Sequence, residues 1–214
     1  MNNPQMLGVV AQRGWYSRGY LPHFDGGQTP QMVTFRLIDS FPTKCLGEWA
    51  DELAAMESGQ AECERRRRIE EYLDKGFGTA CLTLPAVGQI ILQALNCFNG
   101  QRYRIHAWTI MPNHVHVLLT PNESLSQILH SWKSFTANKA NSVMGRTGSF
   151  WQREYFDRAV RNEEHFAAAI DYIHNNPVKA GLCQTPTEWL LSSASPKQDS
   201  PNPKNLPFKL EGIS

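Results

Sequence analysis

Several features of common protein classes are missing from this 214-residue sequence. No apolar run approaches the ~20 residues that a membrane-spanning helix needs, and the first residues have no convincing signal-peptide core. The five cysteines are odd in number, scattered, and never arranged as Cys-x-x-Cys. This pattern argues against a disulfide framework and against a structural zinc site. We therefore expect a cytoplasmic protein that has no membrane partner.

The sequence also carries little net charge, +1 at pH 7, which is low for a protein that binds DNA through a general electrostatic field. The charge is unevenly placed, with a small acidic excess in residues 1–101 and a small basic excess in residues 102–179. The densest basic run is Arg65–Arg68. Arg66 and Arg67 can pair with Glu70 and Glu71 four residues further on, so this run is expected to be a solvated helix.

The hydrophobic content of 41% is enough for one sizeable core, and no internal repeat is evident. We expect a single domain over residues 1–183. From residue 184 the composition turns to proline, serine, lysine and asparagine, so residues 184–214 are expected to form a poorly ordered tail. Apolar periodicity predicts strands at 31–38, 103–111, 114–120, near 150 and at 158–161, and helices near 46–53 and at 62–74, 85–98, 124–141 and 162–176.

Two histidines one residue apart occur in the second strand of the predicted hairpin. Side chains two residues apart on a strand leave the same face ~6–7 Å from each other, so His114 and His116 can both bind one divalent cation. Val115 and Val117 would face one side of the strand and the histidines the other, so the histidines need not be core residues. His-x-His is short and common, and the alternative is a polar face without a metal.

A second group of polar side chains lies about sixty residues further on. Asn162 suits the N-cap of a helix that Pro177 is expected to end. Tyr172 and Asn176 are four residues apart, so one helix face can present a phenol and an amide together. The plain alternative is a half-buried tyrosine and an asparagine that caps the end of the helix.

Together these segments resemble a known family. Met-Pro-Asn-His-Val-His at 111–116 resembles the HUH motif (histidine, hydrophobic, histidine) of single-strand DNA nucleases. The block from Phe-Trp-Gln at 150–152 through Tyr172 to Asn-Pro-Val-Lys-Ala-Gly at 176–181 resembles the tyrosine segment of REP-associated tyrosine transposases, which are relatives of small insertion-sequence transposases. Arg-Gly-Tyr-Leu-Pro-His-Phe at 18–24 is similar to the opening of one branch. The resemblance covers roughly residues 15–183.

The resemblance implies a fold, a partner and an activity. The fold is α+β, a ferredoxin-like or RRM-like sandwich with helices on one face of an antiparallel sheet. The histidines are expected on the exposed sheet face, with the tyrosine helix over this active-site face. The partner is single-stranded hairpin DNA, bound by a monomer rather than a dimer. The activity is metal-dependent cutting and rejoining of single-stranded DNA near palindromic, REP-like hairpins through a 5′-phosphotyrosine intermediate, which keeps the energy of the broken bond.

The resemblance also implies roles for particular residues. Tyr172 is the expected nucleophile, and His114, His116 and Asn176 are the expected ligands of Mg²⁺ or Mn²⁺. Tyr155 is a rival nucleophile that reads as more exposed. Five basic residues are candidates for contacts with DNA phosphates: Lys133, Arg153, Arg158, Arg161 and Lys179.

Other interpretations of the sequence stay open. Trp132 and Trp151 could stack on bases, although a tryptophan on a helix stripe is more often part of a core. The protein could bind hairpin DNA without turnover. It could also be an unrelated hydrolase that uses His114 and His116 to hold a metal and water as the nucleophile.

Overall fold

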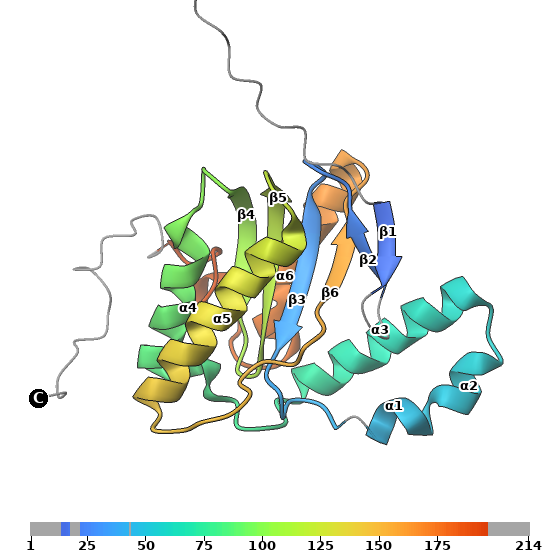
Figure 1. Cartoon of the computed structure of the whole chain (residues 1–214), viewed down its shortest axis with the longest axis horizontal. Coiled ribbons are helices and arrows are strands. Elements are labelled where there is room, and N and C mark those ends of the chain that lie inside the picture. Colours follow the sequence, from blue (N-terminus) through green and yellow to red (C-terminus); the bar gives the residue numbers. More distant parts are fainter. Residues whose placement is uncertain (1–13, 18–21, 43, 197–214) are drawn as a thin grey trace, which may run out of the picture.

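The computed structural model describes residues 14–17, 22–42 and 44–196 (Figure 1). None of the helices in these ranges is long and apolar enough to cross a membrane. The elements are, in order, β1 (Gly14–Ser17), β2 (Pro22–Asp25), β3 (Gln31–Arg36), α1 (Lys44–Glu48), α2 (Ala50–Ala54), α3 (Ser58–Asp74), the 3₁₀ turn η1 (Cys81–Thr83), α4 (Pro85–Cys97), β4 (Tyr103–Ile110), β5 (His114–Pro121), α5 (Leu125–Val143), β6 (Phe156–Ala159), α6 (Glu163–Lys179) and the 3₁₀ turn η2 (Pro186–Glu188).

The main sheet has four antiparallel strands in the order β4-β5-β3-β6. Helix α4 connects β3 to β4 and helix α5 connects β5 to β6, and both lie on one face of the sheet, while α6 lies on the other (Figure 1). This is the strand order and connectivity of a ferredoxin-like fold. The predicted fold class, with the tyrosine helix over the opposite face, is confirmed.

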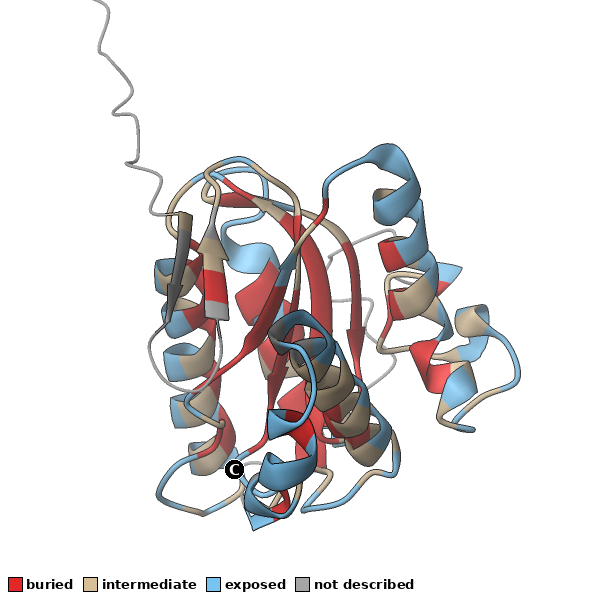
Figure 2. Ribbon diagram, turned by 90° about the vertical axis from the view of Figure 1, so that its right-hand side faces the viewer, coloured by how far each residue is buried: buried red, intermediate tan, exposed pale blue. Residues whose placement is uncertain are grey.

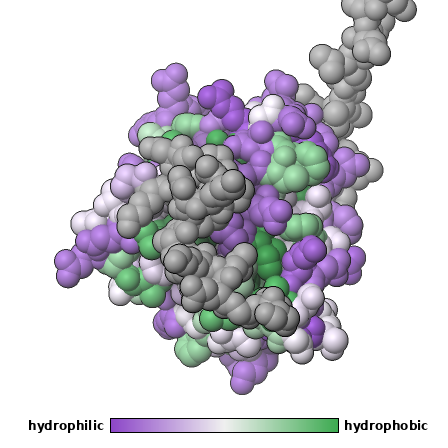
Figure 3. Space-filling model, turned by 90° about the vertical axis from the view of Figure 1, so that its left-hand side faces the viewer, coloured by the Kyte–Doolittle hydropathy of each residue, from purple (hydrophilic) through white to green (hydrophobic). Residues whose placement is uncertain are grey.

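The core fills the space between the sheet and helices α4 and α5. Val33 and Phe35 of β3 and Val115 and Val117 of β5 are buried there, as strand alternation predicted. Figure 2 shows the strands as mostly buried, between helices that expose their outer sides. Seen from the side of α4, the visible surface is mainly hydrophilic with hydrophobic groups in small areas (Figure 3), which is usual for a face that contacts water.

The two tryptophans considered for base stacking belong to this core. The indole of Trp132 donates a hydrogen bond to the hydroxyl of Tyr103 at 2.9 Å, and that of Trp151 donates to Thr136 at 2.8 Å. Both rings are also in contact with Phe35. Both tryptophans are therefore core residues, as the alternative to base stacking predicted.

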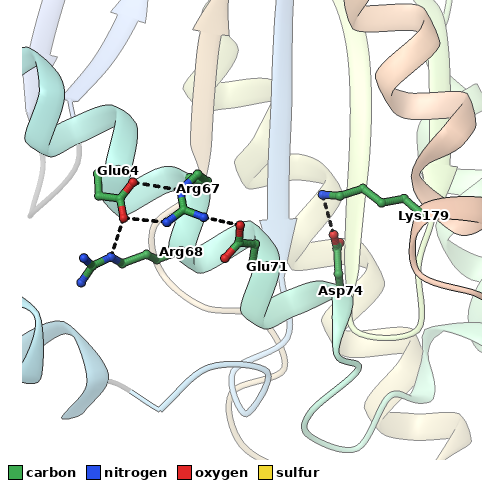
Figure 4. Close-up of polar contacts among 6 residues, drawn as sticks. All are labelled: Glu64, Arg67, Arg68, Glu71, Asp74 and Lys179. Carbon is green, nitrogen blue, oxygen red and sulfur yellow. Dashed lines mark hydrogen bonds and ion pairs between the residues drawn. The ribbon is translucent and has the colours of Figure 1, made fainter.

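Helices α1, α2 and α3 are inserted between β3 and α4, and the helix expected near residues 46–53 is two short helices. Ile69 and Leu73 of α3 pack with Phe41 and Phe156 in a second, smaller core. The outer side of α3 carries the expected ion pair between Arg67 and Glu71 (Figure 4). It also carries ion pairs of Glu64 with Arg67 and Arg68, which were not predicted.

Arg66 departs from the solvated-helix prediction. Its guanidinium is turned inward and donates to the backbone oxygen of Asp157 in β6, at 3.3 Å. This side chain therefore lies on the sheet side of α3 and helps to hold the helix against β6.

The segment after α6 also differs from the prediction. Trp189 donates its indole N–H to the backbone oxygen of Ile110 at 3.0 Å, and the backbone N–H of Ile110 donates to Leu191 at 2.8 Å. The backbone N–H of Ser193 donates to Trp108 at 2.9 Å. Residues 184–196 are thus ordered along β4, because an edge strand offers unpaired backbone groups. Residues 18–21 and 197–214, on which other parts of the predictions fall, lie outside the described residues.

Two extended segments were expected after α5, and one of them forms. Near residue 150 there is only an isolated bridge between Leu37 and Trp151, and the strand itself, β6, begins at Phe156. The backbone of β6 pairs with β3 from Gln31 to Thr34. Strand β6 is therefore an edge strand of the sheet, and one of its faces lies on the same side of the sheet as the histidines.

Candidate active site

The two motif histidines meet on the sheet face beneath α6. The Nε2 atoms of His114 and His116 are 3.0 Å apart, and their ring centroids are 4.6 Å apart. Each residue is only 1% exposed, so the expectation of an exposed sheet face is wrong. The reason is that α6 packs across β4 and β5 and covers this face. The site is a buried pair of imidazoles.

Asn113 sets the orientation of the first imidazole. Its amide nitrogen donates to the backbone oxygens of Leu73, at 3.3 Å, and Phe77, at 2.9 Å, which fixes the amide so that its oxygen points to His114. That oxygen lies 2.7 Å from Nδ1 of His114 and can only accept a hydrogen bond. The neutral ring therefore carries its proton on Nδ1 and leaves the lone pair on Nε2.

Thr34 of β3 orients the second imidazole, that of His116. Its hydroxyl lies 2.7 Å from Nδ1 of His116. A threonine hydroxyl can donate or accept, so it can serve either tautomer of the ring. Burial lowers the pKa of His114 well below 6.5, helped by the charges of nearby cations, and burial together with Lys179 lowers the pKa of His116 to about 3. Both rings are neutral at pH 7, the form that binds metals.

Helix α6 brings the tyrosine and the amide to the histidines. The ring centroid of Tyr172 lies 5.4 Å from that of His116. Asn176 is 1% exposed, and neither of its amide atoms makes a hydrogen bond of normal geometry with the described residues. The same holds for the hydroxyl of Tyr172. Unpaired buried polar atoms are rare in proteins and call for an explanation such as an absent ion or substrate.

Pro177 does not end α6, which continues to Lys179. A proline lacks one N–H donor, but the next turn is kept because the backbone N–H of Ala180 donates to Asn176 at 3.0 Å. The helix then ends before Gly181, which has a φ of +71°. Asn176 is therefore inside the helix, and its alternative role as a C-terminal cap is wrong.

Two carboxylates of α3, those of Glu70 and Asp74, act electrostatically on the phenol of Tyr172. Burial raises the pKa of Tyr172 above its ordinary value of 10, and the negative charges of Glu70 and Asp74 raise it further. Glu70 interacts with the Tyr172 hydroxyl, and burial raises the pKa of Glu70 despite the nearby Arg66. In this state of the site the phenol is protonated at neutral pH.

The candidate DNA-binding residues are spread around the molecule. Lys179 forms an ion pair with Asp74 at 2.9 Å, which ties α6 to α3 (Figure 4). Lys133 donates to the backbone oxygens of Gln152 and Arg153, and burial lowers its pKa to about 8. It lies with Arg153 at a cavity away from Tyr172. The side chains of Arg153, Arg158 and Arg161 are exposed.

The rival nucleophile is less accessible than expected. Tyr155 is only 7% exposed, and its ring lies 4.4 Å from that of His23. His23 also contacts the carboxylates of Asp157, at 2.6 Å, and Glu154, at 3.3 Å. Tyr155 therefore belongs to a buried cluster that joins β2 to β6. His23 is also one of the described members of the N-terminal segment that resembles the family.

The donors near the histidines fit a divalent cation. Two nitrogens at ~2.1 Å from one ion and in adjacent positions are ~3 Å apart, which is the separation of the two Nε2 atoms. In the part of the chain that the structure describes, no group of three or more histidine, cysteine, aspartate and glutamate side chains could hold a metal. The amide of Asn176, whose atoms make no hydrogen bond of normal geometry with the described residues, is a candidate for a third protein ligand.

The segment that holds these residues matches a family of known proteins. Residues 87–176 match the family described as transposase IS200 like. This range includes both histidines and the tyrosine and ends at Asn176. The predicted resemblance to tyrosine transposases is confirmed. Members of such a family are enzymes, and their catalysis is in general metal-dependent.

The chain is also similar to two curated proteins and to one solved structure. A REP-associated tyrosine transposase of Escherichia coli (strain K12) is 26% identical over 91 residues, which is 42% of this chain and 54% of the relative. A protein of Haemophilus influenzae with the same family description is 28% identical over 96 residues, 39% of this chain and 54% of the relative. The chain thus spans about half the length of these curated relatives. A solved structure described as a REP-associated tyrosine transposase bound to a REP hairpin has a TM-score of 0.48 and 18% identity, covering 83% of this chain and 80% of that one.

Proposed function

We propose that this protein is a metal-dependent tyrosine endonuclease and strand-transferase that cuts and rejoins single-stranded DNA near palindromic, REP-like hairpins. The observation that carries the proposal is the meeting of Tyr172 with His116, at 5.4 Å between rings, beside the paired Nε2 atoms and the unpaired amide of Asn176. The names of the E. coli and H. influenzae relatives support the same activity.

His114, His116 and Asn176 would hold the metal. A site of two neutral imidazoles and one amide oxygen suits Mn²⁺, and Mg²⁺ by its abundance in the cell. When bound, such a cation supplies positive charge that stabilises the negative charge on a phosphate oxygen. The chain contributes the fixed directions of the ligands, which Asn113 and Thr34 orient through Nδ1 of each ring.

Tyr172 provides the nucleophile. A bond forms between its phenolic oxygen and the phosphorus, and the bond from phosphorus to the 3′ oxygen breaks, which leaves a 5′-phosphotyrosine and a free 3′-hydroxyl. The phenol must give up its proton, which the Glu70 carboxylate beside it can accept, and the departing 3′ oxygen takes up a proton from water to become the 3′-hydroxyl. Reversal of the same step with another 3′-hydroxyl joins strands, so no nucleotide cofactor is required.

Tyr172 and the histidines come from the same chain and are in contact, so one copy contains a complete set of candidate catalytic side chains. This supports action as a monomer. Arg153, Arg158 and Arg161 are exposed and could contact phosphates. Lys179 could do so only by leaving its ion pair with Asp74, and Lys133 could do so only by releasing two backbone oxygens.

The test is a denaturing gel of the protein after incubation with labelled single-stranded hairpin DNA and Mn²⁺. We expect a covalent adduct that Tyr172→Phe abolishes and Tyr155→Phe retains. Binding without cleavage would instead indicate a hairpin-binding protein without turnover. Cleavage without an adduct would indicate a hydrolase that uses water.

A further inference from the structure

A cavity of about 250 Å³ opens beside Tyr172, on the same sheet face as the histidines. It lies between α3 and α6, over strands β3 and β6. Its volume is several times the ~30 Å³ of a water molecule and below the ~300–1,000 Å³ of pockets for drug-sized ligands. The cavity therefore has room for one small ring system and not for several.

The lining of the cavity combines apolar side chains with charged ones. Met32 and Phe156 come from the strands, and Ala169 comes from α6. Arg66 and Arg158 also line it, and the side chain of Arg158 is exposed. The buried Nε of Arg66 has no hydrogen-bond partner among the described residues. A flat apolar group could enter the cavity, and a negatively charged backbone would stay beside the exposed side chain of Arg158.

Two acidic residues line the cavity, Glu70 and Asp157. The carboxylate of Asp157 already contacts His23 and the backbone N–H of Phe24, so the Glu70 carboxylate is the acidic group considered for the occupant. A phosphate inside the cavity would be repelled by Glu70, whereas a base with an exocyclic amino group could donate a hydrogen bond to the carboxylate. Adenine, cytosine and guanine carry such a group, and thymine does not. The hydroxyl of Tyr172, which also lines the cavity, makes no hydrogen bond of normal geometry with the described residues.

We propose that this cavity receives the base of a nucleotide next to the phosphate that Tyr172 attacks, and that it selects bases with an exocyclic amino group over thymine. The inference rests on the proposed function for the position of the phosphate. The base would pack against Met32 and Phe156. Its own phosphate would lie toward the exposed Arg158, so that the cavity fixes which nucleotide lies next to Tyr172.

Two neighbouring alanines of α6 give a matched pair of variants. Ala168 lines the cavity and Ala167 does not, and both are exposed. Ala168→Phe would place a ring in the cavity, while Ala167→Phe adds the same ring to the same helix outside it. Because both positions are exposed, both variants are expected to fold, which melting curves would check.

The probe is a pool of single-stranded oligonucleotides with one common palindromic hairpin and randomised flanks. The fraction retained by the protein and the fraction linked to Tyr172 are both sequenced, for the wild type and each variant. We expect one flanking position at which thymine is depleted ~10-fold. Ala168→Phe should remove this preference at that position alone, and Ala167→Phe should keep it.

Absence of such a position in the wild type, or an equal change in both variants, would overturn the proposal. The base preference can be measured in the retained oligonucleotides whether or not covalent adducts form. A preference that depends on Ala168 without any covalent adduct would therefore refute strand transfer and leave the base pocket standing. Adducts without that preference would refute the base pocket and leave strand transfer standing.

Discussion

Thr34→Val tests how the second imidazole is prepared for a metal. Valine has nearly the shape of threonine but cannot bond to Nδ1 of His116, which the hydroxyl now contacts at 2.7 Å. Without metal, His116 can keep its proton on Nε2, facing Nε2 of His114 at 3.0 Å. With metal, the proton must sit on Nδ1, where the variant offers no acceptor in a buried place. An unpaired buried donor costs ~1–3 kcal/mol, and the lower part of this range corresponds to a ~10-fold loss of metal affinity.

The measurement is calorimetric titration of Mn²⁺ into the wild type, Thr34→Val and Thr34→Ser. Serine keeps the hydroxyl, so its dissociation constant should stay within ~3-fold of the wild-type value, while that of valine should rise ~10-fold. Equal affinities for all three proteins would show that Thr34 does not orient His116 for a cation. A loss in the serine variant as large as that in valine would point to packing instead of the hydrogen bond.

Two further perturbations address the ligands themselves. Asn176→Ala should raise the dissociation constant of Mn²⁺ ~10-fold and change the metal-free stability by at most ~1 kcal/mol, because its amide atoms make no hydrogen bond of normal geometry. A lowered melting temperature with unchanged Mn²⁺ affinity would contradict the ligand role. Since the folded pKa of His116 is lowered to about 3, the unfolded chain binds a proton that the folded chain does not, and stability should fall by up to ~1.4 kcal/mol per pH unit as the pH drops below ~6.5. Denaturant titrations of metal-free protein at pH 7, 6 and 5 should show this slope reduced in His116→Gln, and an unchanged slope would count against a neutral His116.

The hairpin and the main helices could be predicted because their apolar periodicity is local. Val115 and Val117 alternate with the histidines in sequence, and alternation alone decides which face of a strand each residue occupies. Asn162 was likewise readable as an N-cap, and it accepts from the backbone N–H of His165 at 2.8 Å.

The burial of the site could not be predicted from the same patterns. It depends on the packing of α3 and α6 against the sheet, and these helices are separated in sequence by the whole hairpin. Asn113 stands directly before His114, which was the only local signal of its role. Its other partners, Leu73 and Phe77, are 40 and 36 residues away. Thr34 and Glu70 lie on polar positions that look like ordinary surface until the tertiary contacts are known.

The segment along β4 has a consequence for self-association. The outer edge of a sheet can add a strand from another molecule, which is a common route to aggregation and to dimers with continuous sheets. Here the N–H groups of Trp108 and Ile110 that such a strand would use are already taken, by the Ser193 hydroxyl at 2.9 Å and by Leu191 at 2.8 Å. In a chain cut after residue 183, the backbone N–H groups of Trp108 and Ile110 would lack these partners. Shortened versions of the protein should therefore retain residues 184–196, because this segment blocks pairing of the β4 edge with a strand of another molecule.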